Sequence, residues 1–166
     1  LVATILAAAS AVDNVSTFDT GLTLTNDAPD VFPLGATAVT FSATDAMGLS
    51  HTASTTVTVT DQAGPLLTAP APITVAAVDD TGTPKANAAV AAFLAAASGT
   101  DNVDSSVTVT NNAATTLALG DNLITFNAVD AAGNNAATAT STLTVADQTA
   151  PVITVPATLS VLGTEA

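Results

Sequence analysis

The sequence predicts an all-β protein made of tandem antiparallel β-sandwiches, and three observations support this prediction. Short runs alternate Val or Ile with Thr, which is the pattern of strands that bury one face. Gly, Asn, Asp and Pro fill the gaps between these runs and favour turns. The whole order of runs and turns occurs twice in the 166 residues. The chain is therefore expected to hold small sandwiches in series.

A joint between sandwiches occurs twice. Residues 57–70 run from a strand through Asp-Gln and a proline into a second strand, and residues 143–156 repeat this order. Pro65 and Pro151 thus hold the same place in successive repeats. The division predicts a first sandwich at 1–62 that lacks its first strand, a second sandwich at 63–148, and at 149–166 the first strand of a following repeat or a donor strand for the next copy.

The second repeat contains the clearest elements. Val107 and Val109 alternate with Thr, and Ile124 and Phe126 share one face of another run, as in half-buried strands. An Ala-rich stretch at 86–97 is expected to form a short helix, or a helix leading into a strand, because Ala has the highest helix propensity. A short helical segment of this kind is expected in each sandwich. The expected strands are 22–25, 31–34, 38–44 and 54–60 in the first repeat, and 73–76, 105–110, 116–119, 123–129 and 136–145 in the second.

The charge balance excludes several classes of partner and activity. One Lys and no Arg stand against 14 acidic residues, giving a formal net charge of -13. Nucleic acids and anionic membranes need cationic contacts, so neither is expected as a partner. The absence of Cys rules out a disulfide framework and thiolate metal sites. His51 is the single imidazole and has no paired nucleophile, so we do not expect an enzyme.

Motifs shared by both repeats resemble those of the hyalin-repeat family. An Asp-Asn pair follows the first core segment, and a Gly then precedes a Val-Thr-Phe or Ile-Thr-Phe strand. An Asp-Ala-x-Gly turn ends that strand, within residues 42–48 and again within 127–134. The resemblance covers nearly the whole chain. It implies immunoglobulin-like sandwiches in tandem on extracellular proteins, including large bacterial adhesins, and hence an extracellular or bacterial cell-surface location. The helix expected at 86–97 departs from this pattern, which has a plain strand there.

Three separate segments are expected to bring carboxylates to one junction. In a sandwich of this strand order, the turns that hold Asp101 and Asp130 lie at the pole where the chain enters, and the entering chain carries Asp61. Oxygen ligands that converge without His or Cys favour Ca²⁺, which takes roughly six to eight oxygens. Alternatively, these are ordinary turn residues, because Asp stabilises turns by bonding its own backbone. The candidate ligands are Asp61, Asp101, Asp104 and Asp130, with Asp13, Asp45 and Asp147 at the junctions with neighbouring repeats or copies.

The last residues match what the first repeat lacks. The leading strand of the second repeat, at 67–77, has no counterpart in the first, whereas residues 152–166 form a strand of that kind with no sandwich after it. Either the chain is a window of a continuous array, or copies join head to tail and this strand completes the sheet of the next copy through main-chain hydrogen bonds. The candidate assembly residues are Val152, Ile153, Val155, Leu159 and Val161.

Together these features favour a structural repeat of an extracellular fibre, stalk or adhesin. Calcium would stiffen its junctions, and its partners would be neighbouring repeats or copies of itself. The alternative is a polysaccharide-binding accessory module of a secreted enzyme. Sugar sites usually present exposed aromatic faces, and the chain has no Trp or Tyr, so the structural role is the better supported of the two.

Overall fold

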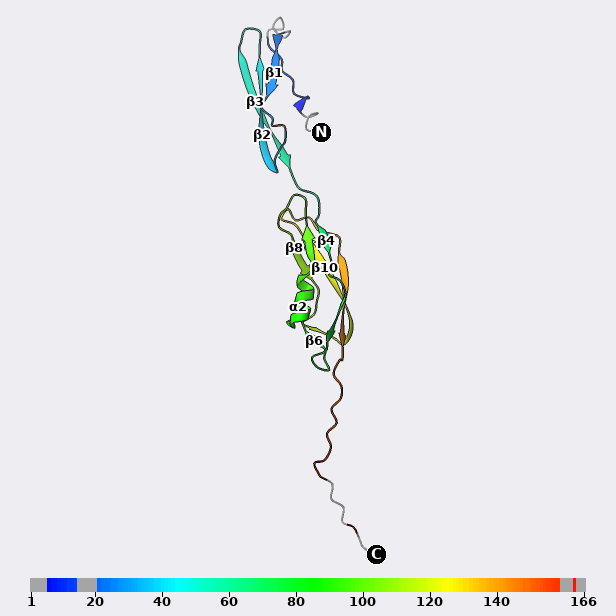
Figure 1. Cartoon of the computed structure of the whole chain (residues 1–166). Coiled ribbons are helices and arrows are strands. Elements are labelled where there is room, and N and C mark those ends of the chain that lie inside the picture. The colour runs from blue at the N-terminus through cyan, green and yellow to red at the C-terminus, as the bar shows by residue number, and fades with distance from the viewer. Residues whose placement is uncertain (1–5, 15–20, 159–162, 164–166) are drawn as a thin grey trace. The chain divides into compact units, whose positions relative to one another are not determined.

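The protein is built mostly from β-strands, which confirms the all-β prediction. The computed structural model describes residues 6–14, 21–158 and 163. The chain divides into two compact units, Leu1–Gln62 and Ala63–Ala166 (Figure 1). Each unit has its own sheet and is described separately. No helix in the described ranges is both long and apolar enough to cross a bilayer.

The second unit is organised around a four-stranded sheet. Its strands lie in the order β5 (Ile73–Ala76), β11 (Ala139–Ala146), β10 (Gly120–Val129) and β8 (Thr108–Asn111). β10 runs antiparallel to both of its neighbours, whereas β5 runs parallel to β11. Alternate residues of β11 are buried and partly exposed, as its alternation of apolar and Thr side chains predicts. The sheet therefore has one face toward the core.

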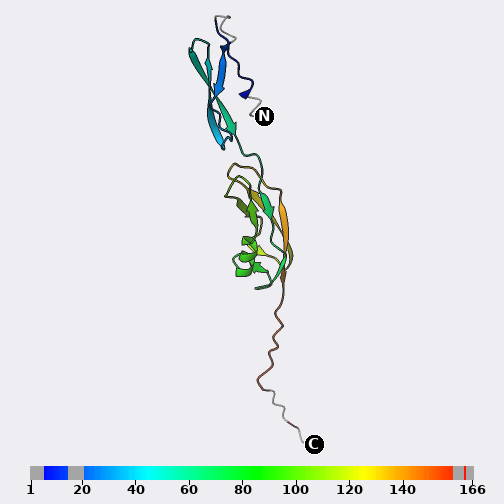
Figure 2. The same ribbon diagram turned by 45° about the horizontal axis from the view of Figure 1, so that its top comes forward.

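Shorter elements cover that face. β4 (Leu66–Thr68) pairs with β7 (Ser98–Thr100), and β6 (Thr83–Pro84) pairs with β9 (Thr116–Leu117), both antiparallel. The single helix of the described second unit, α2 (Ala88–Ala95), lies beside them, and both views show it against the strands (Figure 1, Figure 2). These elements and the sheet form the two layers of the sandwich.

The core of the second unit lies between these layers. Phe126 on β10 is fully buried and meets Phe93 of α2 edge to face, with ring centroids 6.1 Å apart and an interplanar angle of 62°. This is a favoured geometry for an aromatic pair. The other buried apolar side chains of this cluster come from the sheet, the helix and β9: Val75, Val90, Leu117, Ile124, Leu143 and Val145.

The helix forms where the Ala-rich stretch predicts one, but it is shorter than 86–97. Asn87 caps its first turn, because the side-chain oxygen accepts a hydrogen bond from the Ala89 N–H at 3.0 Å. Val90 and Phe93, three residues apart, are its buried side chains and share one face of the helix. Packing of this face, together with Ala propensity, explains why a helix stands in this layer.

The first unit repeats part of this plan. Its three-stranded sheet has the order β1 (Thr23–Asn26), β2 (Gly35–Thr44) and β3 (Ser50–Val59), all antiparallel. Val39 is fully buried, whereas β3 is largely exposed. Gly35 and its counterpart Gly120 open β2 and β10 with φ of +92° and +90°, a conformation that favours glycine.

Several sequence predictions need correction. Residues 31–34 do not form a strand, and β2 begins at Gly35; Pro33 has no N–H to donate to a ladder. The leading strand expected at 67–77 is two short strands, β4 and β5, separated by a segment that contains Pro70 and Pro72. The strand expected to start at 105 starts at Thr108. The helical segment expected in the first repeat falls largely on residues outside the described ranges.

Candidate metal site

Three carboxylates approach one another at the N-terminal pole of the second unit. Asp101 directly follows β7, Asp130 directly follows β10, and Asp61 lies in the segment that leads from β3 to β4. Each offers an oxygen within 4.8 Å of the others; Asp61 and Asp101 are half-buried and Asp130 is buried. The structure therefore brings together the three acids that the strand order placed at this pole.

Asp130 is held by its own turn. Its two carboxylate oxygens accept hydrogen bonds from Asn134, from the backbone N–H at 2.7 Å and from the side-chain amide at 2.9 Å. Burial raises the pKa of Asp130, but the hydrogen bonds from Asn134 and from the turn backbone outweigh it, so the pKa lies below its ordinary value of 3.8. The carboxylate is therefore charged at neutral pH.

Asp101 and Asp104 shape the neighbouring loop. Oδ1 of Asp101 accepts the backbone N–H groups of Val103 at 2.8 Å and of Asp104 at 3.0 Å. Oδ2 of Asp104 in turn accepts the N–H groups of Ala131 and Ala132, at 3.0 and 3.1 Å. Asp104 is not in the group of three and instead joins the Asp101 loop to the Asp130 loop. Its sequence position next to Asp101 gave no sign of this contact.

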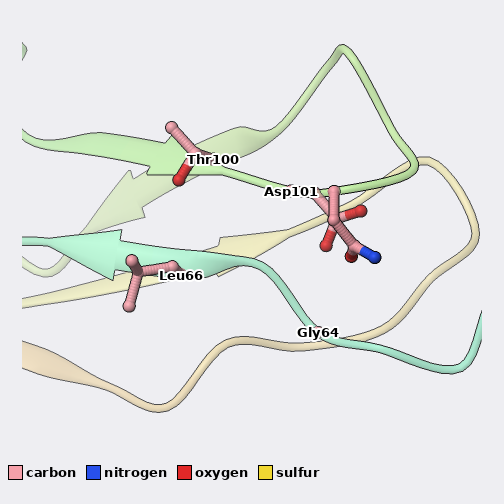
Figure 3. A pocket seen from close by; sticks show the side chains of 5 residues that line it. Gly64, Leu66, Thr100 and Asp101 are labelled. Carbon is pink, nitrogen blue, oxygen red and sulfur yellow. The ribbon is translucent and has the colours of Figure 1, made fainter.

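Gly64 fixes the segment that enters the second unit. A Cβ at this position would lie 2.2 Å from the carbonyl oxygen of Asn135, so only glycine allows this approach. Asp61 lies three residues before this contact. Figure 3 shows Gly64 and Asp101 on neighbouring segments around a pocket of about 360 Å³. The close approach of Gly64 is a second determinant of this pole that sequence reasoning missed.

The first unit carries a matching pair of acids. Asp13 and Asp45 line one hollow of about 200 Å³. Oδ1 of Asp45 accepts the N–H groups of Met47 at 2.8 Å and of Leu49 at 2.9 Å, much as Asp130 accepts that of Asn134. Among the described residues, Asp13 and Asp45 are not part of a group of three acids.

Asp147 lies apart from these acids. It belongs to the C-terminal pole of the second unit, where it lines a pocket with Asp79 and Asp80. Its Oδ1 accepts the N–H of Thr149 at 2.9 Å. This places Asp147 at the start of the segment that follows the second unit, as Asp61 stands in the segment that follows β3.

Three of the five predicted assembly residues lie in the part of the chain that the structure describes. Val152, Ile153 and Val155 are 90, 86 and 73% exposed and belong to no strand. Leu159 and Val161 lie outside the described residues. The segment after Asp147 thus carries apolar side chains that the second unit does not cover.

The group of three acids has the chemistry of a hard-cation site. Carboxylate oxygens without nitrogen or sulfur ligands suit Ca²⁺. Each oxygen has two lone pairs, so the turn hydrogen bonds of Asp101 and Asp130 leave capacity for an ion. Three like charges within 4.8 Å of one another repel, and a divalent cation would offset that repulsion. The same hydrogen bonds also fit the alternative, in which these acids stabilise their own turns.

Comparison with known proteins finds a sequence similarity to Hyalin. The chain is 34% identical over 139 residues to Hyalin from Lytechinus variegatus, which covers 81% of this chain. The chain spans 26% of the length of that protein. No protein-family model matches the chain. The similarity agrees with the motif resemblance and points to a hyalin-repeat-like domain, of the kind expected for an extracellular structural or adhesive module.

Proposed function

We propose that the chain is a structural segment of an extracellular fibre, stalk or adhesin, in which sandwich units follow one another. The observation that carries this proposal is the internal repeat: β2 with β3 and β10 with β11 are equivalent hairpins, each entered at a glycine and each turning at an aspartate. The similarity to Hyalin supports an extracellular repeat module.

Calcium is the ion that we propose for the three acids. An ion held by Asp61, Asp101 and Asp130 would tie the segment that enters the second unit to two of its loops. Movement of that segment would then cost the ion's coordination energy, so the joint would stiffen. The distances among the three carboxylates and their charge support this assignment.

Calcium titration of the full chain tests this assignment. Isothermal titration should detect heat with Ca²⁺, and Ca²⁺ should raise the melting temperature relative to a chelator, because a ligand that binds only the folded state stabilises it. Asp61→Asn should abolish both effects. Asp121→Asn is the matched control: this acid lies at the other end of β10 and bonds Thr144, so the calcium response should persist. If Ca²⁺ gave no heat and no change in melting temperature with the unaltered chain, the calcium assignment would be wrong and the three acids would serve only to stabilise their turns.

We further propose that units join head to tail through the segment after Asp147. β11 carries β5 on one edge, whereas the equivalent edge of β3 pairs with no strand in the described part of the chain. A strand of the β5 type, from a neighbouring repeat of the same polypeptide or from a second copy, would complete that sheet by main-chain hydrogen bonds.

Sedimentation velocity of the full chain over a range of concentrations tests the joining between copies. Head-to-tail contacts are heterologous and produce open chains unless the rotation between copies closes a ring. We therefore expect a series of growing species as concentration rises. A single monomeric species at all concentrations would limit the joining to repeats within one polypeptide.

A further inference from the structure

An apolar groove lies open in the first unit. It has a volume of about 320 Å³, and its lining includes Val12, Leu24, Phe41 and Ala53. Phe41 is only half-buried, whereas its counterpart Phe126 is fully buried in the second unit. Leu24 on β1 is also 40% exposed. The first unit therefore has core side chains that its described residues do not cover.

The second unit shows what fills the equivalent space. There β4 lies against β7, with Leu66 opposite Thr100 and Thr68 opposite Ser98. Leu67 packs against the hydrophobic core, as does Ala69 just beyond the strand. Leu66 points outward and is 71% exposed. One face of this short segment thus packs against the core cluster that contains Phe126.

The same segment occurs again after the second unit. Residues 151–155 begin with a proline three positions after an Asp-Gln pair, as residues 65–69 do. In this alignment Ile153 takes the place of Leu67, and Val155 takes the place of Ala69. Both are highly exposed in the described structure, at 86 and 73%. Val152 takes the place of the outward-facing Leu66.

The first unit also keeps the partner of that segment. Residues 10–12 correspond to β7, because Leu-Ala-Ala-Ala directly precedes Ser10 and Ser98, the first residue of each segment. Ala11, the counterpart of Gly99 opposite Leu67, lines the apolar groove. The groove is large enough for two aliphatic side chains, since a cavity of about 150 Å³ holds a benzene molecule. Residues 149–158 carry no charge, so their docking adds no repulsion to a chain of net charge -13.

We propose that the apolar groove of the first unit receives Ile153 and Val155 from a second copy of this chain, with residues 152–154 antiparallel to residues 10–12. This inference rests on the proposed head-to-tail joining and specifies its contact. In that register Ile153 and Val155 face Phe41, whereas Val152 and Thr154 face outward. The donor segment repeats in a second copy what β4 does within the second unit.

The test uses the full chain and a labelled synthetic peptide of residues 147–158. Peptide binding is followed by fluorescence anisotropy, and self-association by sedimentation velocity. The peptide should bind the full chain. Ile153→Asp in the peptide should weaken binding at least about tenfold, because the variant loses the apolar burial of Ile153 and a carboxylate is costly to transfer from water into an apolar groove. Val152→Asp in the peptide is the matched control and should bind within about twofold of the unaltered peptide.

A second pair of variants tests the groove itself. Leu24→Asp should weaken peptide binding in the same way, whereas Thr25→Asp on the other face of β1 should not; circular dichroism checks that both fold. Equal binding by the two altered peptides would overturn the inference while leaving head-to-tail joining in place. No binding of the unaltered peptide would overturn the inference too. If the unaltered chain also failed to self-associate, the proposed joining between copies would be overturned as well. The calcium response does not depend on the groove contact or on joining between copies.

Discussion

Truncation of the two equivalent phenylalanines should have very different effects on stability. Phe126 is fully buried and meets Phe93 at 6.1 Å, so Phe126→Ala removes a core side chain and leaves a cavity. Such changes cost about 3–5 kcal/mol of the free energy of unfolding, which includes about 0.5–1.5 kcal/mol for the aromatic pair. Phe41 occupies the same place in the first unit but is half-buried. Phe41→Ala should therefore cost about 1 kcal/mol, half of the transfer free energy of a buried side chain.

Hydrogen exchange in increasing urea, read by mass spectrometry, measures both effects in the full chain. Peptides from β10 and from β2 report each unit separately, and the lack of Trp and Tyr makes intrinsic fluorescence a poor probe. The measurements should be made at low concentration, so that no second copy covers the groove beside Phe41. Equal losses of stability in the two units would refute the reasoning, because they would mean that Phe41 is as completely enclosed as Phe126.

Two further predictions concern the stability effects of substitutions at the N-terminal pole of the second unit. The pKa of Asp130 is lowered in the folded state by hydrogen bonds from Asn134 and its turn, so its contribution to stability is complete above the ordinary value of 3.8 and is lost as pH falls through the folded pKa. In acid titrations followed by circular dichroism, the stability difference between the unaltered chain and Asp130→Asn should be constant near neutral pH and shrink below about pH 4; a constant difference throughout would contradict this. Gly64→Ala should lower the stability of the second unit by about 1–3 kcal/mol, since its Cβ would overlap the Asn135 carbonyl. Ala150→Gly, at the corresponding exposed position, should leave the calorimetric melting curve of the second unit unchanged.

Much of the fold follows from local pattern. The alternation around Ile124 and Phe126 predicted β10 because a strand places alternate residues on one face, and both side chains are buried. The helix followed from the high helix propensity of Ala. The convergence of Asp101 with Asp130 was predictable because both follow strands that end at one pole.

The remainder depends on contacts between distant segments. The parallel pairing of β5 with β11 leaves no trace in either strand's sequence, since both alternate as antiparallel strands do. Gly64 is an ordinary small residue in the sequence, and only the position of the Asn135 carbonyl explains it. Asp104 resembled a further ligand because it lies near Asp101, but its hydrogen bonds go to the loop after β10.

The parallel register of β5 and β11 determines how the second unit responds to tension. The chain enters β4 at the N-terminal pole and leaves β11 at the opposite one. A pull on both ends therefore drags β5 and β11 past each other along their lengths. Four residue pairs, from Ile73 with Leu143 to Ala76 with Ala146, are then loaded in shear and must yield together. An antiparallel hairpin pulled from its open end would instead unzip pair by pair, so this register makes the unit resistant to stretching.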